Sequence, residues 1–280
     1  MAPGRFLWSS AALSDVGLVR RVNEDACLDA CERGTWAVAD GMGGHDFGDV
    51  ASGMLVQALA CQPSRRPLTP YTEAIRIRLQ KLNDDLRTVA AMRGVPMIGT
   101  TVVALLAVGQ ECAVLWAGDS RAYLLRRGLL RQLTQDHRQA DCPAPASADG
   151  VTGPARAADT TGLAGGHADG VSTATGERSP TASASNVITR AVGASATLLL
   201  DETRVSVEDG DIFLLCSDGL SNMVMDIEIA HALMHGSCRQ AAQALVSLAL
   251  QRGGGDNVTV VVASATDLDS NERTVFNPAV

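Results

Sequence analysis

This chain lacks the features that place proteins in membranes, outside the cell or on nucleic acids. No apolar run approaches the length that spans a bilayer, and the N-terminus has no basic region followed by an apolar core. A basic tract of the density that nucleic acid requires is also missing, and the net charge is −8. These absences predict a cytoplasmic protein that binds neither a membrane nor nucleic acid.

Aromatic residues and paired cysteines are scarce as well. Aromatics make up 3% of the chain against 46% hydrophobic residues, which predicts a sizeable and mainly aliphatic core. The seven cysteines are odd in number and irregularly spaced, without a pair of Cys-x-x-Cys motifs, so we expect reduced thiols. Cys27 and Cys31 are close, but their four-residue spacing is more often accidental than metal-binding.

The stretch Val38-Ala39-Asp40-Gly41-Met42-Gly43-Gly44 joins an apolar run to a glycine-rich turn through a single carboxylate. An apolar run, 35–39, ends in a carboxylate, and three glycines follow within four residues. A glycine-rich turn often cradles a phosphate, but Asp46 stands where the third glycine of a dinucleotide motif belongs, and no Gly-Lys-Ser/Thr sequence occurs. Because a carboxylate repels a pyrophosphate, Asp40 suits a hard cation better.

Hydrophobic periodicity predicts a mixed fold of helices and strands. Helices are expected at about 48–61, from Thr69 as N-cap and Pro70 as first helical residue, and at about 226–235 and 238–252. Strands are expected at 5–13, 26–31, 34–40, 100–108, 112–117, 121–126, 198–207, 211–217 and 257–264, with a short segment at 129–133. Hairpin-linked strands beside grouped helices indicate antiparallel sheets with segregated helices.

The segment 140–185 differs from the rest of the chain in composition. It is nearly all Ala, Ser, Thr, Gly, Pro and Asp, so it cannot bury enough apolar surface to offset the entropy lost on ordering. We therefore expect a mobile loop there, and a frayed polar tail at 267–280.

Four more acids share the setting of Asp40, at the end of an apolar strand or in a turn beside one: Asp25, Asp119, Asp218 and Asp256. A lone acid in such a place is usually a turn former or a helix cap. Five carboxylates clustered at one end of a sandwich would repel each other unless cations were bound among them. Ligation by oxygen alone indicates magnesium or manganese and not zinc.

Seven short motifs identify a family that this chain resembles. In chain order they are Arg20-x-x-Asn23-Glu24-Asp25, Asp40-Gly41-Met42-Gly43-Gly44, Gly99-Thr100-Thr101, Gly118-Asp119-Ser120-Arg121, Leu133-Thr134-x-Asp136-His137, Ser217-Asp218-Gly219-Leu220 and Gly255-Asp256-Asn257-Val258-Thr259. Their order is that of the metal-dependent Ser/Thr protein phosphatases of the type 2C (PPM) family, in their bacterial single-domain form. The resemblance runs from about residue 10 to 264, interrupted by the low-complexity segment.

The resemblance implies an α+β fold, an α-β-β-α sandwich of two antiparallel sheets flanked by helix pairs. Residues 1–266 would form a single domain, with the flap of the family replaced by the low-complexity insert at about 140–185. A centre of two or three Mn²⁺ or Mg²⁺ ions would lie at one end of the sandwich.

Residue roles also follow from the resemblance. Asp40 would bridge two ions, and the Gly41 carbonyl would complete one of them. Asp218 and Asp256 would hold the other ion. The two ions would lower the pKa of a bridging water that attacks phosphorus in line. No covalent phosphoenzyme is needed, so Cys216, with its apolar neighbours, is expected to be a core residue.

The remaining roles concern outer ligands and substrate. Glu24 and Asp25 would act largely through metal-bound water. Asp119 matches the acid that binds a third, weaker metal in bacterial members. Arg20 matches the arginine that grips the substrate phosphate, for which its planar bidentate donor is suited.

The chain departs from the family at two places. Eukaryotic relatives have a histidine, proposed as the general acid, where this chain has Met42; His45 is open to catalysis or packing, and water on the third metal is an alternative proton donor. The family's flap usually adds an acid to the third metal, and the sequence does not choose among Asp141, Asp149, Asp159 and Asp169.

The expected function is a hydrolase that dephosphorylates phosphoserine and phosphothreonine in proteins and opposes a bacterial kinase. Its partners would be kinase substrates or the kinase itself, and we expect a monomer. The alternative is a catalytically weak phosphatase fold that binds phosphoproteins as a regulatory module, but its mark would be loss of metal acids, and Asp40, Asp218 and Asp256 are all present. A sensor that switches a transcription-factor regulator would need an attached sensory or membrane domain, for which this chain has no room.

Overall fold

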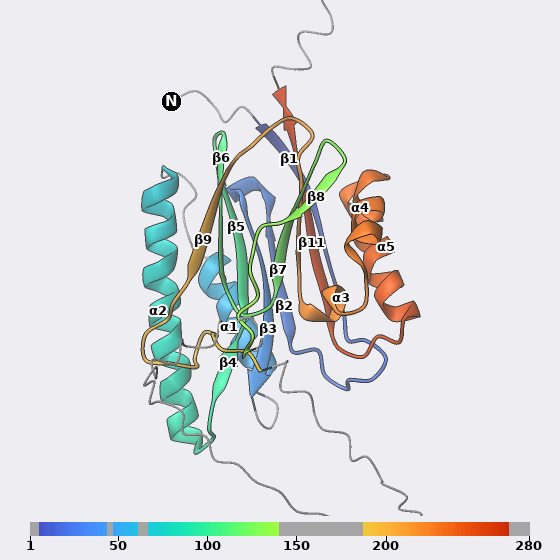
Figure 1. Ribbon diagram of the computed structural model, residues 1–280. Helices are drawn as coiled ribbons and strands as arrows, with labels where there is room; N and C mark the ends of the chain where they lie inside the picture. Colours follow the sequence, from blue (N-terminus) through green and yellow to red (C-terminus); the bar gives the residue numbers. More distant parts are fainter. Residues whose placement is uncertain (1–5, 44–46, 61–66, 140–186, 269–280) are drawn as a thin grey trace, which may run out of the picture.

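Two antiparallel sheets stack face to face between two groups of helices (Figure 1). The computed structural model describes residues 6–43, 47–60, 67–139 and 187–268. One sheet has five strands in the order β1 (Phe6–Asp15), β11 (Val258–Asp267), β10 (Ile212–Cys216), β7 (Arg121–Arg126) and β8 (Leu129–Gln132). The other has the order β2 (Asp25–Ala30), β3 (Thr35–Gly43), β5 (Val102–Val108), β6 (Glu111–Ala117) and β9 (Asp201–Ser206), with β4 (Ile98–Thr100) on β3.

The β3 strand explains why the sandwich needs helices outside it. Alternate side chains of a strand point to opposite faces, and β3 is apolar on both. Trp36 and Val38 pack between the two sheets, whereas Ala37 and Ala39 face a core formed with the helices. That outer core is covered by α1 (Gly48–Ala60) and α2 (Leu68–Arg93).

The five-stranded sheet is covered in the same way on its outer face. Residues of β7, β10 and β11 pack there against α4 (Asp226–Met234) and α5 (Cys238–Gln251), as the right side of Figure 1 shows. Together the layers form the predicted α-β-β-α sandwich, so the α+β fold class is confirmed.

Two predicted strands are interrupted for identifiable reasons. The expected strand at 100–108 is divided between β4 and β5 at Thr101. The Thr101 N–H donates to the Asp40 carbonyl, and Thr101 Oγ1 accepts from the Asp40 N–H, so this residue does not continue the strand. The strand expected at 198–207 begins only at Asp201. Its first residues bond to α2 instead of a neighbouring strand: the Leu198 N–H donates to the Gln80 side chain, and the Leu200 carbonyl accepts from Arg76.

The predicted start of α2 was wrong by two residues. The helix begins at Leu68, and its N-cap position is Pro67, without a side-chain cap. Leu68 is buried in the core beneath the helix, so the helix starts two residues earlier than predicted. Thr69 therefore caps nothing, and its hydroxyl accepts a hydrogen bond from Arg204 at 2.9 Å.

The C-terminal boundary also differs from the prediction. Asp267 was assigned to a frayed tail, but it is the last residue of β11, pairs with Phe6, and is buried. The rest of that tail after Leu268 and the predicted mobile loop at 140–185 lie outside the described residues.

The short helix α3 (Asp218–Ser221) was not predicted from the sequence.

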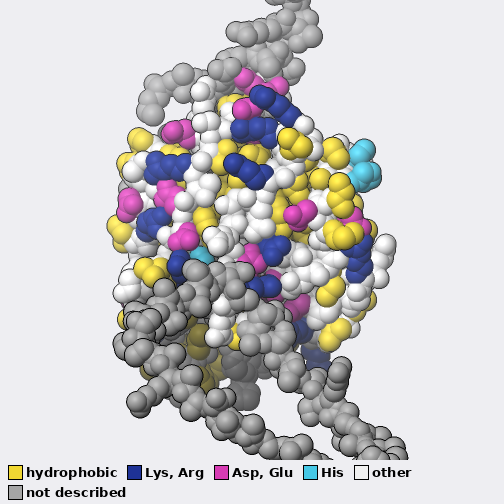
Figure 2. Space-filling model, viewed as in Figure 1, with side chains coloured by type: hydrophobic (Ala, Val, Ile, Leu, Met, Phe, Trp, Pro, Cys, Tyr) yellow, Lys and Arg dark blue, Asp and Glu magenta, His cyan; other side chains and the backbone are white. Residues whose placement is uncertain are grey.

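Three further properties bear on the expectations about chemistry and location. The cysteines that the structure describes are all free thiols. Among the described residues, no helix is both long and apolar enough to cross a bilayer. On the face shown in Figure 2, basic and acidic side chains are interspersed.

Candidate functional site

One edge of the sandwich gathers the predicted acids of the six-stranded sheet. Asp25 begins β2 and lies directly opposite Asp40 of β3 in the antiparallel register. Directly opposed residues have Cβ atoms about 4.5–5.5 Å apart, so two like charges there oppose folding. Asp40 is fixed through its backbone: its N–H donates to Thr101 Oγ1 at 2.9 Å, and its carbonyl accepts from the Thr101 N–H at 2.8 Å.

The five-stranded sheet brings two more acids to the same edge. Asp218 follows the end of β10 and opens α3, while Asp256 precedes the start of β11. Because β10 and β11 are antiparallel neighbours, these two ends meet. A hydrogen bond of 2.7 Å from the Ser217 hydroxyl to Asp25 Oδ2 then joins the edges of the two sheets.

Burial and mutual repulsion raise the pKa values of these carboxylates. Burial raises the pKa of Asp40 well above its usual value, and the charges of Asp25, Asp218, Asp119 and Asp256 raise it further, in that order. Burial likewise raises the pKa of Asp25 to about 6, against hydrogen bonds that lower it. The pKa of Asp218 is also raised to about 6, by burial first and then by Asp119 and Asp256.

These shifts predict how the metal-free protein responds to pH. A carboxyl whose pKa is about 6 when folded and 3.8 when unfolded binds more protons in the folded state between those values, so stability falls as pH rises through this window. Urea unfolding of metal-free protein should therefore give a free energy on the order of 2 kcal/mol larger at pH 5 than at pH 7 for Asp25 and Asp218 together. Asp218→Asn should flatten this dependence, and an equal slope in both proteins would contradict the assignment.

Two glycines allow Glu24 to approach the site. A Cβ on Gly41 would lie 2.0 Å from the Gly48 carbonyl oxygen and 2.7 Å from that of Glu24. A Cβ on Gly48, the first residue of α1, would lie 2.4 Å from Glu24 Oε1. The carboxylate of Glu24 therefore lies against the first turn of α1, where the helix dipole favours negative charge.

Asn257 organises the loops around the site, a role that the sequence did not indicate. Its side-chain nitrogen donates to the carbonyls of Val16 and Val22, at 2.9 and 3.0 Å, and its Oδ1 accepts from the Glu24 N–H at 2.8 Å. The side chain is buried. It joins the loop of Arg20 and Glu24 to that of Asp256, a contact between residues far apart in sequence that no local pattern reveals.

Arg20 lies at the rim of the carboxylate cluster. Its Nη2 is 2.9 Å from Asp256 Oδ2, with 54% of the Arg20 side chain and 38% of the Asp256 side chain exposed. The negative charges of Glu24 and Asp40 also act on its guanidinium. An exposed pair of this kind contributes little to stability and separates readily, so the guanidinium can turn toward a ligand.

Asp119 lies near enough to raise the pKa values of Asp40 and Asp218, and its side chain is 3% exposed. Its Oδ2 accepts from Arg138 Nε at 2.9 Å, while its Oδ1 is buried with no hydrogen-bond partner among the described residues. The loop that carries Asp119 is held by His137, because the Gly118 N–H donates to His137 Nδ1 and the ring stacks on Trp116. His137 belongs to the motif Leu133-Thr134-x-Asp136-His137, but no role for it was predicted from the sequence.

The donor set fits hard divalent cations. It consists of carboxylates at one edge. Burial and mutual repulsion make their charged forms unfavourable unless protons or cations bind. Within the described ranges, no three His, Cys, Asp or Glu side chains are preassembled as ligands of one ion. Carboxylates are the ligands of Mg²⁺-like ions, which keep several waters and bind through one or two of them.

Cys216 is excluded as a nucleophile. It is fully buried, and burial raises the pKa of its thiol to about 12. The thiolate is therefore not populated near neutral pH. This agrees with the expectation of a core residue.

The expected proton donors and flap ligands fall in two groups. His45 and the flap acids Asp141, Asp149, Asp159 and Asp169 lie outside the described residues. Met42 is on β3, and its thioether has no ionisable proton that could serve in general acid catalysis.

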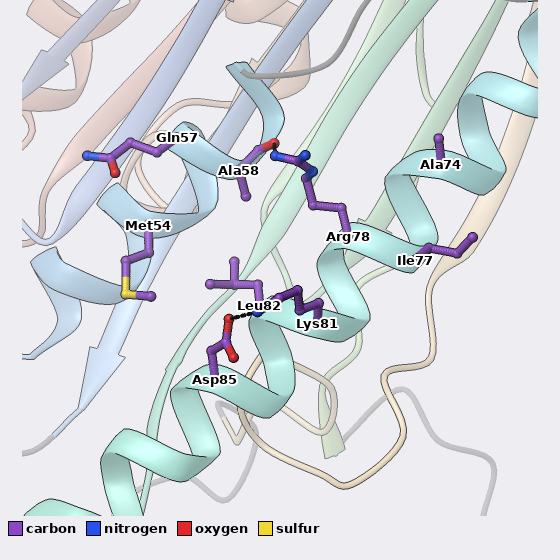
Figure 3. Close-up of a pocket in the computed structure, with 9 residues that line it drawn as sticks. All are labelled: Met54, Gln57, Ala58, Ala74, Ile77, Arg78, Lys81, Leu82 and Asp85. Atoms are coloured by element: carbon purple, nitrogen blue, oxygen red, sulfur yellow. Dashed lines mark hydrogen bonds and ion pairs between the residues drawn. The ribbon is translucent and has the colours of Figure 1, made fainter.

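A groove elsewhere on the molecule does not belong to this site. It has a volume of about 690 Å³ and lies between α1 and α2 (Figure 3). Its lining comprises Met54, Gln57, Ala58, Ala74, Ile77, Arg78, Lys81, Leu82 and Asp85. The acid Asp85 is paired with Lys81 at 2.7 Å, so the groove offers no carboxylate cluster for a cation.

Comparison with known proteins gives the family. Residues 13–142 match the family model described as Protein phosphatase 2C. The Serine/threonine phosphatase stp of Listeria monocytogenes is 30% identical over 265 residues, which cover 89% of this chain and 92% of stp. The chain belongs to the protein phosphatase 2C family, and the predicted resemblance is confirmed. Proteins of this family are metal-dependent hydrolases.

Two further relatives extend the comparison. The Serine/threonine protein phosphatase PstP of Mycobacterium tuberculosis is 35% identical over 92% of this chain, but the chain spans only 45% of PstP. The solved catalytic domain of PstP, in complex with two manganese ions, is 32% identical with a TM-score of 0.73, covering 94% of this chain and all of that one. PppA, a key regulatory component of T6SS in Pseudomonas aeruginosa, is 38% identical with a TM-score of 0.76, over 92% of this chain and 97% of its own.

Proposed function

We propose that this protein is a metal-dependent phosphatase that hydrolyses phosphoserine and phosphothreonine in proteins. The observation that carries the proposal is the convergence of Asp25, Asp40, Asp218 and Asp256 from both sheets on one edge, where the other three raise the pKa of Asp40. Membership in the protein phosphatase 2C family and the two manganese ions of the PstP catalytic domain support it.

The proposed ions are two Mn²⁺ or Mg²⁺. Asp40 would bridge them with the Gly41 carbonyl on one side, and Asp218 and Asp256 would hold the second. When bound, such a pair supplies Lewis acidity and a water of lowered pKa. Asp25, held by Ser217, and Glu24, held against α1, would accept hydrogen bonds from waters at the centre and fix their orientation.

Arg20 is proposed to bind the phosphate of the substrate. It is exposed at the rim, and a guanidinium donates two parallel hydrogen bonds to phosphate oxygens. The carboxylates of the cluster repel a phosphate, so a cation at the rim offsets this repulsion.

Arg20→Ala should chiefly raise the KM for a phosphopeptide, because the contact exists in both ground and transition states. A charge-assisted contact of roughly 1.5–3 kcal/mol predicts a loss of about ten- to a hundredfold in kcat/KM. Arg21→Ala is the matched control and should leave KM unchanged. If Arg21→Ala raises KM and Arg20→Ala does not, the phosphate is held by the neighbouring residue.

We further propose that the chain up to Asp267, one residue beyond the expected boundary at 266, forms one phosphatase domain that acts on the substrates of a bacterial Ser/Thr kinase or on the kinase itself. Pairing of β1 with β11 along their whole length supports the domain assignment, because it ties the two ends of the described chain into one sheet.

The test is release of inorganic phosphate from a phosphothreonine peptide. We expect release with Mn²⁺, loss of release on chelation with EDTA, and recovery when Mn²⁺ is restored in excess. Binding of the peptide without release at any Mn²⁺ concentration would favour the regulatory module instead. No release and no binding would contradict both functions.

A further inference from the structure

Arg138 places a guanidinium between two of the acids at the site. Its Nε lies 2.9 Å from Asp119 Oδ2, and its Nη2 lies 3.5 Å from Asp218 Oδ2. Its side chain is 13% exposed. One fixed positive charge therefore spans the acid predicted to bind a third metal and an acid predicted to bind the main pair.

The backbone and the neighbouring charges hold Arg138 in this position. The backbone of Arg138 forms an isolated antiparallel β-bridge with that of Ile188, and the next residue, Gln139, donates its N–H to the Val187 carbonyl. Asp136 Oδ2 lies farther away, at 3.8 Å. That carboxylate is already bound bidentately by Arg121, at 2.9 Å through Nε and 2.8 Å through Nη2. The charge of Arg138 is thus left for Asp119 and Asp218.

We propose that Arg138 takes the place of the third metal ion at Asp119, so that this protein uses a centre of two ions. The inference rests on the proposed function, because it concerns the site beside the proposed pair. A guanidinium stays charged at all accessible pH values, and it neutralises the buried carboxylate without a metal. The guanidinium would repel a divalent ion on the same carboxylate, and burial leaves this repulsion weakly screened.

Burial distinguishes this pair from the one at Arg20. Arg20 and Asp256 are 54% and 38% exposed, so their ion pair separates at little cost when Asp256 binds an ion. Arg138 and Asp119 are 13% and 3% exposed, and separating them would leave an uncompensated buried charge.

The first test is the stoichiometry of Mn²⁺ binding, measured by calorimetry on the full chain. Wild type should bind about two equivalents, Arg138→Lys about two, and Arg138→Ala about three, the third weakly, since removing the charge frees Asp119. Arg131→Ala, an exposed arginine on β8, is the matched control and should bind as wild type does. Three equivalents in wild type that fall to two in Asp119→Ala would overturn the inference, as would two equivalents in Arg138→Ala.

The second test needs no metal. In metal-free buffer, Asp119→Ala and Arg138→Ala should each lower the Tm, and the double variant should lose clearly less than the sum of the two losses. Additive losses would overturn the pairing. Absence of Mn²⁺ binding to wild type would instead contradict the proposed function, and this cycle would still decide whether Arg138 is the cation of Asp119.

Discussion

Asp40→Asn is expected to abolish phosphatase turnover and to raise the Tm of the metal-free protein. Asp40 has the carboxyl whose pKa is raised by all four neighbouring acids, so a neutral isostere relieves repulsion that the apo protein otherwise bears. The same change removes the ligand proposed to bridge both ions. A bound Lewis acid is worth several kcal/mol of transition-state stabilisation, so kcat should fall about a thousandfold or more.

The fold should survive this substitution, because Thr101 holds the backbone of Asp40 and not its carboxylate. Circular dichroism and thermal unfolding in EDTA check this alongside the assay. Glu73→Gln, an exposed carboxylate on α2 away from the site, is the control and should leave both turnover and Tm unchanged. Near-normal turnover of Asp40→Asn at modest Mn²⁺ would contradict the dinuclear assignment, and a large fall in apo Tm would contradict the electrostatic argument.

Gly41→Ala should be strongly destabilising, and its matched control should be stabilising. The added Cβ would lie 2.0 Å from the Gly48 carbonyl oxygen and 2.7 Å from that of Glu24, and both are backbone atoms that cannot rotate away. Overpacking against a fixed backbone costs about 3 kcal/mol or more. Gly53 lies inside α1 with no atom within 4 Å of its added Cβ, so Gly53→Ala should gain about 0.5–1 kcal/mol.

Chemical denaturation of both variants measures these effects. If Gly41→Ala is as stable as wild type, the close approach of β3, Glu24 and α1 is not present in the folded protein. If Gly53→Ala is destabilised equally, the effect of Gly41→Ala reflects general intolerance of α1 and not a steric clash at the site.

The fold was largely predictable because burial on both faces leaves a strong local signal. The apolar run of β3 ending at Asp40 is visible in sequence, and so is the buried stripe of α2. Boundaries were less predictable, since tertiary contacts decide them. Thr69 has the chemistry of a cap, but burial of Leu68 starts the helix earlier. Asp267 looks like tail sequence, yet its pairing with Phe6 extends β11.

The acids of the site were predictable for a related reason: each follows or precedes an apolar strand, and antiparallel neighbours bring such ends together. The residues that hold them were not predictable as such. Asn257 joins loops more than 230 positions apart in the chain, and its role depends on three backbone contacts. Arg138 reads in sequence as one more charge beside Asp136 and His137, and only the geometry shows that it spans Asp119 and Asp218.

The claim that these carboxylates hold two divalent ions is tested most directly by crystals grown with Mn²⁺, using anomalous scattering to locate the ions. The proposal predicts two peaks at this edge of the sandwich, both about 2 Å from Asp40 oxygens, with Asp218 and Asp256 on one of them. Peaks that lie elsewhere on the protein, or an edge without any peak at saturating Mn²⁺, would contradict it.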